Sequence, residues 1–96
     1  METLFVFSKS PWARRDMETW LPRVREQDQV LLIQDAVLAL RSACSDLSES
    51  LAPLKGRLWA LEADLEARGV KAQEAGVVDY RGAVELILEA NRVLAL

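Results

Sequence analysis

The sequence predicts an α/β fold in three layers, with helices on both faces of a mostly parallel sheet of four or five strands. Apolar runs such as residues 29–33 are too continuous to alternate, which is typical of strands covered on both faces. Segments with apolar residues three and four apart follow these runs, as amphipathic helices require. Strands that alternate with helices at this spacing imply parallel pairing and right-handed crossovers.

The chain begins with a predicted strand and a predicted helix. Residues 3–7 are apolar and β-favouring, and a polar loop follows them. A helix is expected from Trp12, with Ser10 as its cap and Pro11 at its first position. Pro22 lies inside the helical pattern and should kink this helix or start a second short one.

A second strand and a long second helix are expected next. The strand covers residues 29–33, and Asp35 is placed to cap the free amides of a helix that ends before Pro53. The apolar stripe of this helix repeats at three- and four-residue spacing and consists of Val37, Leu40, Cys44, Leu47 and Leu51.

The third unit has clear boundaries. Residues 57–61 predict a strand, and the charges of Glu62 and Asp64 suit the N-terminus of the short helix that follows. Gly69 supplies the left-handed residue that ends such a helix.

The last quarter predicts a fourth strand at residues 77–78 and a helix capped by Asp79 that ends near Asn91. The apolar tail 93–96 leaves three possibilities open. It could continue the helix, form an edge strand, or dock on another chain.

Composition limits the class of protein. A chain of 96 residues with 51% hydrophobic and 28% charged residues predicts a single folded domain over 1–96. A domain this small gains stability from a partner that covers apolar surface. The net charge of −3 argues against direct nucleic-acid binding, which needs a basic face. We expect no membrane segment, because no run approaches about 18 apolar residues, and a cytoplasmic location.

Catalytic residue types are scarce. The chain has no histidine, which excludes imidazole as a base, nucleophile partner or metal ligand. Cys44 is the single cysteine, so neither an internal disulfide nor a multi-thiolate metal site can form. Its place on an apolar helical stripe favours core packing over thiol chemistry, and a persulfide on Cys44 is the alternative. We expect no cofactor, no metal and no catalytic residue in this chain.

Ligands of parallel α/β sheets gather at the carboxyl ends of the strands. Here those ends are the loops Ser8 to Trp12, Gln34 to Asp35 and Glu62 to Asp64. The first loop has no glycine with which backbone amides could wrap a phosphate, so it is neither a P-loop nor a dinucleotide fingerprint. A helix start at Ser10 and Pro11 is the favoured interpretation of this loop, and a protein-interface role for Trp12 is the alternative. Asp35 could instead accept a phosphoryl group. That chemistry requires further acidic residues around a metal and a lysine near the far end of the sheet, where the late segment offers only Lys71.

Basic residues gather in the first quarter, where a positive face could form. They are Lys9, Arg14, Arg15, Arg23 and Arg25. Because Asp16, Glu18 and Glu26 interleave with them, a mixed solvated surface is the favoured interpretation, and a surface that faces RNA within a larger assembly is the alternative.

Several stretches, taken in order, resemble the TusB/DsrH family over nearly the whole chain. They are Lys9-Ser10-Pro11-Trp12, the run Val30-Leu31-Leu32-Ile33-Gln34-Asp35-Ala36-Val37, the Ala-Leu and Asp-Leu stretch from Trp59 to Gly69, and Asp79-Tyr80. The resemblance rests on all of these stretches together, at matching spacing.

The resemblance implies a DsrEFH-like domain, flavodoxin-like in its broad class, that serves as one subunit of a heterohexamer. Its expected partners are TusC/DsrF-like and TusD/DsrE-like subunits, with a homo-oligomer possible when the chain is isolated. Such complexes relay sulfur as a protein-bound persulfide, toward 2-thiolation of the tRNA wobble uridine in the Tus branch and in sulfur oxidation in the Dsr branch. The principal persulfide cysteine belongs to the D/E-type partner.

One departure from the family bears on the role of this chain. Some DsrH-type members have a cysteine in the stretch that matches residues 17–21, where this chain has Trp20. This favours the TusB branch and a noncatalytic role. The residues expected at subunit interfaces are Trp12, Trp20, Tyr80, Leu94 and Leu96. The alternatives are a sulfurtransferase that carries a persulfide on Cys44 and a stand-alone binding domain with a ligand near Asp35.

Overall fold

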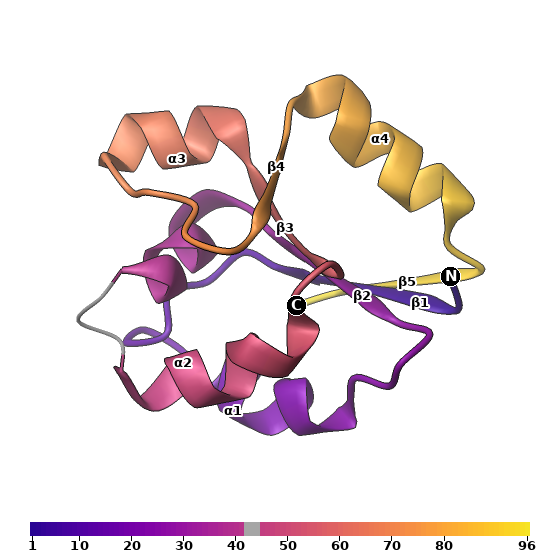
Figure 1. Cartoon of the computed structure of the whole chain (residues 1–96), viewed down its shortest axis with the longest axis horizontal. Helices are drawn as coiled ribbons and strands as arrows, with labels where there is room; N and C mark the ends of the chain where they lie inside the picture. The colour runs from indigo at the N-terminus through magenta and orange to yellow at the C-terminus, as the bar shows by residue number, and fades with distance from the viewer. Residues whose placement is uncertain (42–44) are drawn as a thin grey trace.

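Five strands form a single parallel sheet in the computed structural model, which describes residues 1–41 and 45–96 (Figure 1). The strand order is β4-β3-β2-β1-β5, and every neighbouring pair is parallel. The strands are β1 (Thr3–Phe7), β2 (Gln29–Leu32), β3 (Leu58–Leu61), β4 (Gly76–Val78) and β5 (Arg92–Ala95). The predicted α/β fold with a parallel sheet is confirmed.

The α-helices are α1 (Asp16–Trp20), α2 (Ser45–Leu51), α3 (Glu62–Arg68) and α4 (Tyr80–Glu89). Three 3₁₀ helices join them: η1 (Leu21–Arg23), η2 (Gln34–Leu40) and η3 (Ala52–Leu54).

The strand order determines which face each helix covers. The chain moves in one direction across the sheet from β1 to β4, so right-handed crossovers place α1, α2 and α3 on the same face. The connection from β4 to β5 runs back across the sheet, which places α4 on the opposite face. In Figure 1, α4 accordingly lies across the sheet from α1 and α2. One face therefore has several helices and the other has a single long one.

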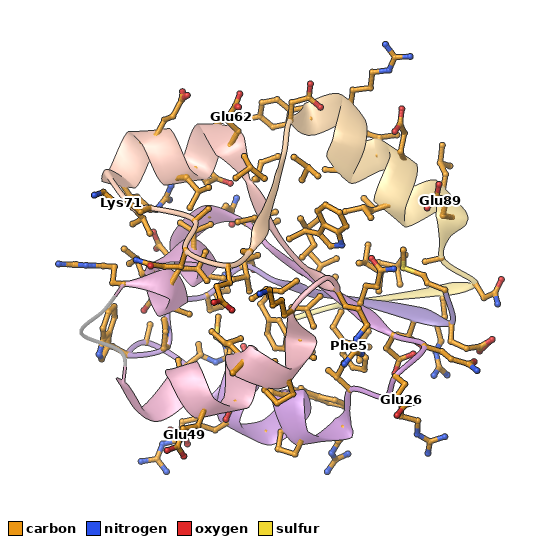
Figure 2. The ribbon with its side chains drawn as sticks, viewed as in Figure 1. Phe5, Glu26, Glu49, Glu62, Lys71 and Glu89 are labelled. Atoms are coloured by element: carbon orange, nitrogen blue, oxygen red, sulfur yellow. The ribbon has the colours of Figure 1, made fainter. Side chains whose placement is uncertain are left out.

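Two apolar clusters fill the space above and below the sheet. The larger one joins alternate residues of the strands, including Phe5, Phe7 and Leu32, to α1, α2, α3 and the 3₁₀ helices. The smaller one joins Leu4, Leu31 and other strand residues to Ala83 and Leu86 of α4. Figure 2 shows Phe5 inside the molecule, whereas the labelled charged residues Glu26, Glu49, Glu62, Lys71 and Glu89 lie at its periphery. Burial of both faces of the strands explains why the apolar runs do not alternate.

Local capping signals predicted two helix ends correctly. Gly69 ends α3 in the left-handed region, at φ 61°. The Asp79 side chain caps α4, because its Oδ1 accepts a hydrogen bond of 2.8 Å from the amide of Gly82. The open question of the tail is also answered, since residues 92–95 form the edge strand β5 beside β1.

The first helix differs from its prediction. It begins at Asp16 and not at Trp12, because residues 11–13 form a separate turn. The Ser10 hydroxyl accepts a hydrogen bond of 3.0 Å from the amide of Ala13 within that turn and so does not cap α1. Pro22 lies in the first turn of the short helix η1, which begins at Leu21, so a second short helix is the observed one of the two outcomes expected for it.

The predicted long second helix is wrong. Its first part is the 3₁₀ helix η2 and its second part is α2, and the cap of η2 is Ile33 with no side-chain hydrogen bond. Asp35 lies inside η2, so the capping role assigned to it is also wrong. Cys44 lies outside the described residues.

Candidate functional site

The second and third loops at the carboxyl edge of the sheet meet through Arg68. Its guanidinium, on α3, contacts Asp35 Oδ1 at 2.9 Å and Asp64 Oδ1 at 3.4 Å. Asp64 Oδ2 also accepts a hydrogen bond of 2.7 Å from the amide of Gln34, whose φ is 51°. Sequence reasoning placed the two aspartates at this edge but missed the cation that joins them. Both carboxylates contact Arg68, and Asp64 also accepts from the amide of Gln34, so these residues connect η2 to α3.

The first loop is tied to the end of β5. The amide and hydroxyl of Ser8 both donate to the main-chain oxygen of Leu96, at 3.2 and 2.9 Å. In open parallel sheets a ligand crevice forms where strand order reverses, which here lies between β1 and β5. Leu96 therefore lies at the place where such a crevice would open.

The residues expected at subunit interfaces divide into two groups. Trp12 and Tyr80 are exposed by 62% and 67% of their surface. Trp20 is half-buried against the larger cluster, with the Arg23 guanidinium 5.0 Å from the centre of its ring. Leu94 and Leu96 also pack against that cluster, because β5 pairs with β1. The structure thus brings only Trp12 and Tyr80 to the surface as prominent side chains.

Basic residues of the first quarter lie on a mixed surface. Arg14 contacts Asp16 at 3.6 Å and Arg15 contacts Glu18 at 3.9 Å, all on or beside α1. The interleaved acidic residues therefore offset part of the positive charge, in agreement with the mixed surface that the sequence favoured.

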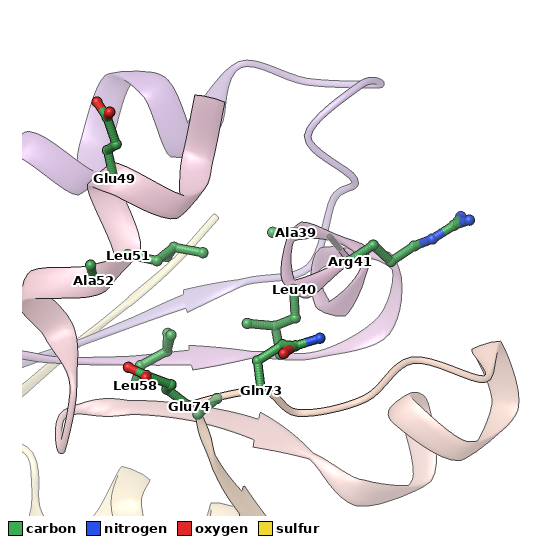
Figure 3. Close-up of a pocket in the computed structure, with 10 residues that line it drawn as sticks. Ala39, Leu40, Arg41, Glu49, Leu51, Ala52, Leu58, Gln73 and Glu74 are labelled. Carbon is green, nitrogen blue, oxygen red and sulfur yellow. The ribbon is translucent and has the colours of Figure 1, made fainter. Parts of the chain in front are cut away.

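A cavity of about 510 Å³ lies between η2, α2 and the chain that leads into β4. In Figure 3 the side chains of Leu40, Leu51 and Leu58 point toward a common space, while Arg41 and Glu49 point away from it. The described lining residues offer apolar surface and include no hydroxyl or thiol. This lining suits packing, and its described residues supply no hydroxyl or thiol nucleophile.

The outer face of α4 carries the largest group of exposed apolar side chains on any described helix. They are Tyr80, Val84, Ile87 and Leu88, which are 67%, 52%, 42% and 77% exposed. Their spacing places them on one side of the helix, while Ala83 and Leu86 face the sheet. The helical periodicity of the sequence groups these four residues with Ala83 in one apolar stripe, and among them only Tyr80 was expected at an interface. The structure divides that group, because Ala83 faces the sheet together with Leu86 while the other four residues are exposed.

Two other kinds of feature are missing from the described part of the chain. Residues 1–41 and 45–96 contain no group of three or more acidic, cysteine or histidine side chains that could hold a metal ion. Across the same residues, no helix has the length and apolar character to span a bilayer.

Comparison with known proteins connects this geometry to a family. The model of the family described as DsrH like protein matches residues 9–93. Protein TusB of Cronobacter sakazakii is 36% identical over 84 residues, which cover 88% of this chain and 86% of that protein. Protein TusB of Pectobacterium parmentieri is 34% identical over 95 residues, or 96% and 98% of the two chains.

A solved structure supports the fold independently of close sequence similarity. The crystal structure of the ychN protein from E. coli superposes with a TM-score of 0.78 over 100% of both chains, at 16% sequence identity. The likeness shows that the two chains share a fold. The family match and the TusB relatives, each spanning most of the sequence, show that this chain belongs to the DsrH/TusB family.

Proposed function

We propose that this chain is a noncatalytic subunit of a sulfur-relay complex of the TusBCD or DsrEFH type. In this role it supports the transfer of persulfide sulfur toward 2-thiolation of the tRNA wobble uridine. Similarity to TusB proteins over 88% and 96% of the chain supports the Tus branch of the family. The proposed partners are TusC/DsrF-like and TusD/DsrE-like subunits, in the cytoplasm.

The observation that carries the noncatalytic role is the side chain of Trp20. Some DsrH-type members have a cysteine in the stretch that matches residues 17–21. In this chain Trp20 ends α1, packs on the larger apolar cluster and lies beneath the guanidinium of Arg23. An indole ring has no thiolate to accept sulfur, so this position stabilises the fold and cannot carry a persulfide.

A noncatalytic subunit acts through the surface that it buries against its partners. Stable protein interfaces bury about 1,200–2,000 Å² in total, and a reactive group keeps its geometry when supporting residues hold it. We propose that this chain holds the thiol loop of a D/E-type partner in position for sulfur transfer. Sulfur is accepted and released on the partner's thiolate, and this chain contributes no covalent step.

Cys44→Ser tests the proposal, because the thiol is the single sulfur nucleophile of the chain. The variant replaces the wild-type copy in the cells that make the protein, and 2-thiouridine is measured by mass spectrometry of digested tRNA. We expect thiolation close to the wild-type level, since serine is nearly isosteric with cysteine and replaces the thiol with a hydroxyl that cannot hold a persulfide. A strain without the gene serves as the control and should lose 2-thiouridine.

Loss of 2-thiouridine in a Cys44→Ser strain whose complex is still assembled would contradict the noncatalytic role. It would favour a sulfurtransferase with the persulfide on Cys44. Normal thiolation in the strain without the gene would instead contradict the assignment to tRNA modification and favour the sulfur-oxidation branch.

A further inference from the structure

We propose that the open edge of β5 pairs in antiparallel fashion with the β5 edge of a second copy of this chain, so that two five-stranded sheets become one. The contact surface consists of β5 and of the side of α4 that faces it. This pairing is a property of the chain itself and does not rest on the proposed function.

The main chain of β5 has hydrogen-bonding groups on two sides, and β1 uses one of them. The amide of Leu96 donates to the main-chain oxygen of Val6 at 2.8 Å. Because these groups alternate along a strand, the amides and carbonyls of Val93 and Ala95 point away from β1. The strand order ends at β5, so the described part of the chain offers no strand on that side (Figure 1). Another extended strand has donors and acceptors at the matching spacing.

The two edges of the sheet differ in how well they suit pairing. Proteins block edge pairing with charges or prolines inside the strand, or with very short strands. After its first residue, β5 continues as Val93-Leu94-Ala95, with no charge and no proline. The opposite edge, β4, has only three residues and begins with Gly76. The β5 edge is therefore open to pairing, and the β4 edge is protected by its length.

From Val93 onward, both faces of β5 are apolar. Val93 is 39% exposed and lies on the α4 face of the sheet, since its register partner Leu4 belongs to the smaller cluster. Leu94 and Leu96 are half-buried against the larger cluster on the other face. A strand beside β5 would cover the exposed remainder of these side chains and remove apolar area from water.

One side of α4 extends this apolar surface. A Cβ atom at position 82 would lie 3.0 Å from Cβ of Val78, so the Gly82 side of the helix faces β4. At 3.6 residues per turn, Val84 and Ile87 lie about 160° and 140° around the axis from Gly82. They therefore face away from β4, toward the β5 edge, and are 52% and 42% exposed.

Charges of opposite sign lie at the two ends of β5. Glu2 and Glu89 lie at its amino end, because the Glu2 main-chain oxygen accepts from the Arg92 amide and Glu89 precedes the strand by three residues. Lys9 lies at its carboxyl end, because the preceding serine donates to the main-chain oxygen of Leu96. In the part of the chain that the structure describes, neither glutamate forms an ion pair, and Lys9 forms none. The amino end is therefore net acidic and the carboxyl end is basic.

This charge pattern is complementary to itself and commits the edge to a second copy. Antiparallel pairing of two β5 strands brings the acidic end of each copy toward the basic end of the other, twice by symmetry. Parallel pairing would bring like charges together. Full overlap of the two strands places Leu94 opposite its own equivalent and Val93 opposite Ala95 of the copy.

Ala95→Pro tests the main-chain contact. Proline has no N–H, and its ring replaces a hydrogen that points away from β1, so the bonds between β1 and β5 remain. Ala95→Ser is the matched control, because serine keeps the amide, and circular dichroism checks that both variants fold. Sedimentation velocity of the purified full chain should show dimers for wild type and Ala95→Ser. We expect Ala95→Pro to raise the dimer dissociation constant at least about 10-fold, since two symmetry-related hydrogen bonds are lost.

A charge exchange tests the antiparallel direction. Lys9→Glu should weaken the dimer, because acidic groups then meet at both ends of the joined strands. Lys9→Glu combined with Glu89→Lys reverses both charges and should return the dissociation constant to within about 3-fold of wild type. A double variant as weak as Lys9→Glu alone would contradict the antiparallel arrangement.

A disulfide trap tests the register and the identity of the paired strand. In a Cys44→Ser background, Leu94→Cys places one thiol opposite its equivalent, at a separation that disulfide geometry permits. Incubation with oxidised glutathione should then give a covalent dimer. Val77→Cys, on the opposite edge strand β4, is the control and should stay monomeric.

β5 is not the pairing edge if wild type is monomeric at every concentration, or if Ala95→Pro dimerises as tightly as wild type. The same conclusion follows if Val77→Cys gives a covalent dimer and Leu94→Cys does not. None of these measurements depends on DsrE-like or DsrF-like partners. Failure of β5 pairing is therefore distinct from failure of the proposed function, which is judged by those partners and by tRNA thiolation.

Discussion

Gly76→Ala should lower the free energy of unfolding of this domain by about 2–3 kcal/mol, as overpacking of a tight contact does. A Cβ atom at position 76 would lie 2.5 Å from Cε3 and 2.6 Å from Cζ3 of Trp59, far inside van der Waals contact. Trp59 and Gly76 are partners in the register of β3 and β4, so the indole lies over the glycine. The ring has little freedom to move, because its Nε1 donates a hydrogen bond of 2.7 Å to Gln29 Oε1.

Urea unfolding of the purified chain measures this effect. The same substitution in a Trp59→Leu background is the matched control, because a smaller side chain leaves room for the new methyl group. There the cost of Gly76→Ala should fall below about 1 kcal/mol, so that the two sites couple strongly. An equal loss of stability in both backgrounds would show that the contact with Trp59 is not the cause.

Asp28→Ala should cost about 2–4 kcal/mol of folding free energy, because it leaves two amides without their acceptor. Asp28 is 6% exposed and lies just before β2. Its Oδ1 accepts from the amide of Thr3 at 3.1 Å, and its Oδ2 accepts from the amide of Arg25 at 2.9 Å. The Arg57 guanidinium completes this end of the sheet by donating to the main-chain oxygens of Arg25 and Asp28, at 2.6 and 3.0 Å.

Thermal unfolding separates the role of this carboxylate from a general effect of substitution. Asp28→Asn keeps one acceptor oxygen and should lose about half as much stability as Asp28→Ala. A second comparison, Glu26→Ala, removes an exposed carboxylate two residues away and should change stability by less than about 0.5 kcal/mol. If Asp28→Ala and Glu26→Ala have the same melting temperature, the two amide contacts contribute nothing measurable to stability.

The elements that could be predicted from the sequence are those with local signals. The apolar runs of β1, β2 and β3, the left-handed residue Gly69 and the cap Asp79 each act within a few residues of their own position. The chain direction across the sheet follows from alternating elements and the handedness of crossovers. These rules need no knowledge of distant contacts.

The second helix was mispredicted because distant contacts decide its form. In η2 the residues Ala36, Val37, Ala39 and Leu40 are all buried, which the expected three- and four-residue stripe does not produce. Asp35 contacts Arg68, which lies 33 residues away in sequence. A local sequence pattern contains no information on that ion pair. The pattern around Asp35 therefore predicted a helix cap, and the structure shows an ion pair in its place.

The exposure of the residues expected at subunit interfaces could be foreseen only in part, for the same reason. Trp12 and Tyr80 are exposed, whereas Leu94 and Leu96 pack inward because the tail pairs with β1, more than 80 residues earlier. Which apolar side chains of α4 stay exposed depends on which side of the helix meets the sheet. The apolar residues can be recognised in the sequence, but the topology decides which of them face the sheet and which face solvent.

Native mass spectrometry of the tagged protein, purified gently from its own cells, tests whether this chain is a subunit of a sulfur-relay complex. We expect an assembly that contains this chain with a TusC/DsrF-like and a TusD/DsrE-like subunit in equal numbers. Peptide sequencing of the released subunits identifies them. Recovery of this chain alone, or as a homo-oligomer without other subunits at every salt concentration, would contradict its assignment as a sulfur-relay subunit.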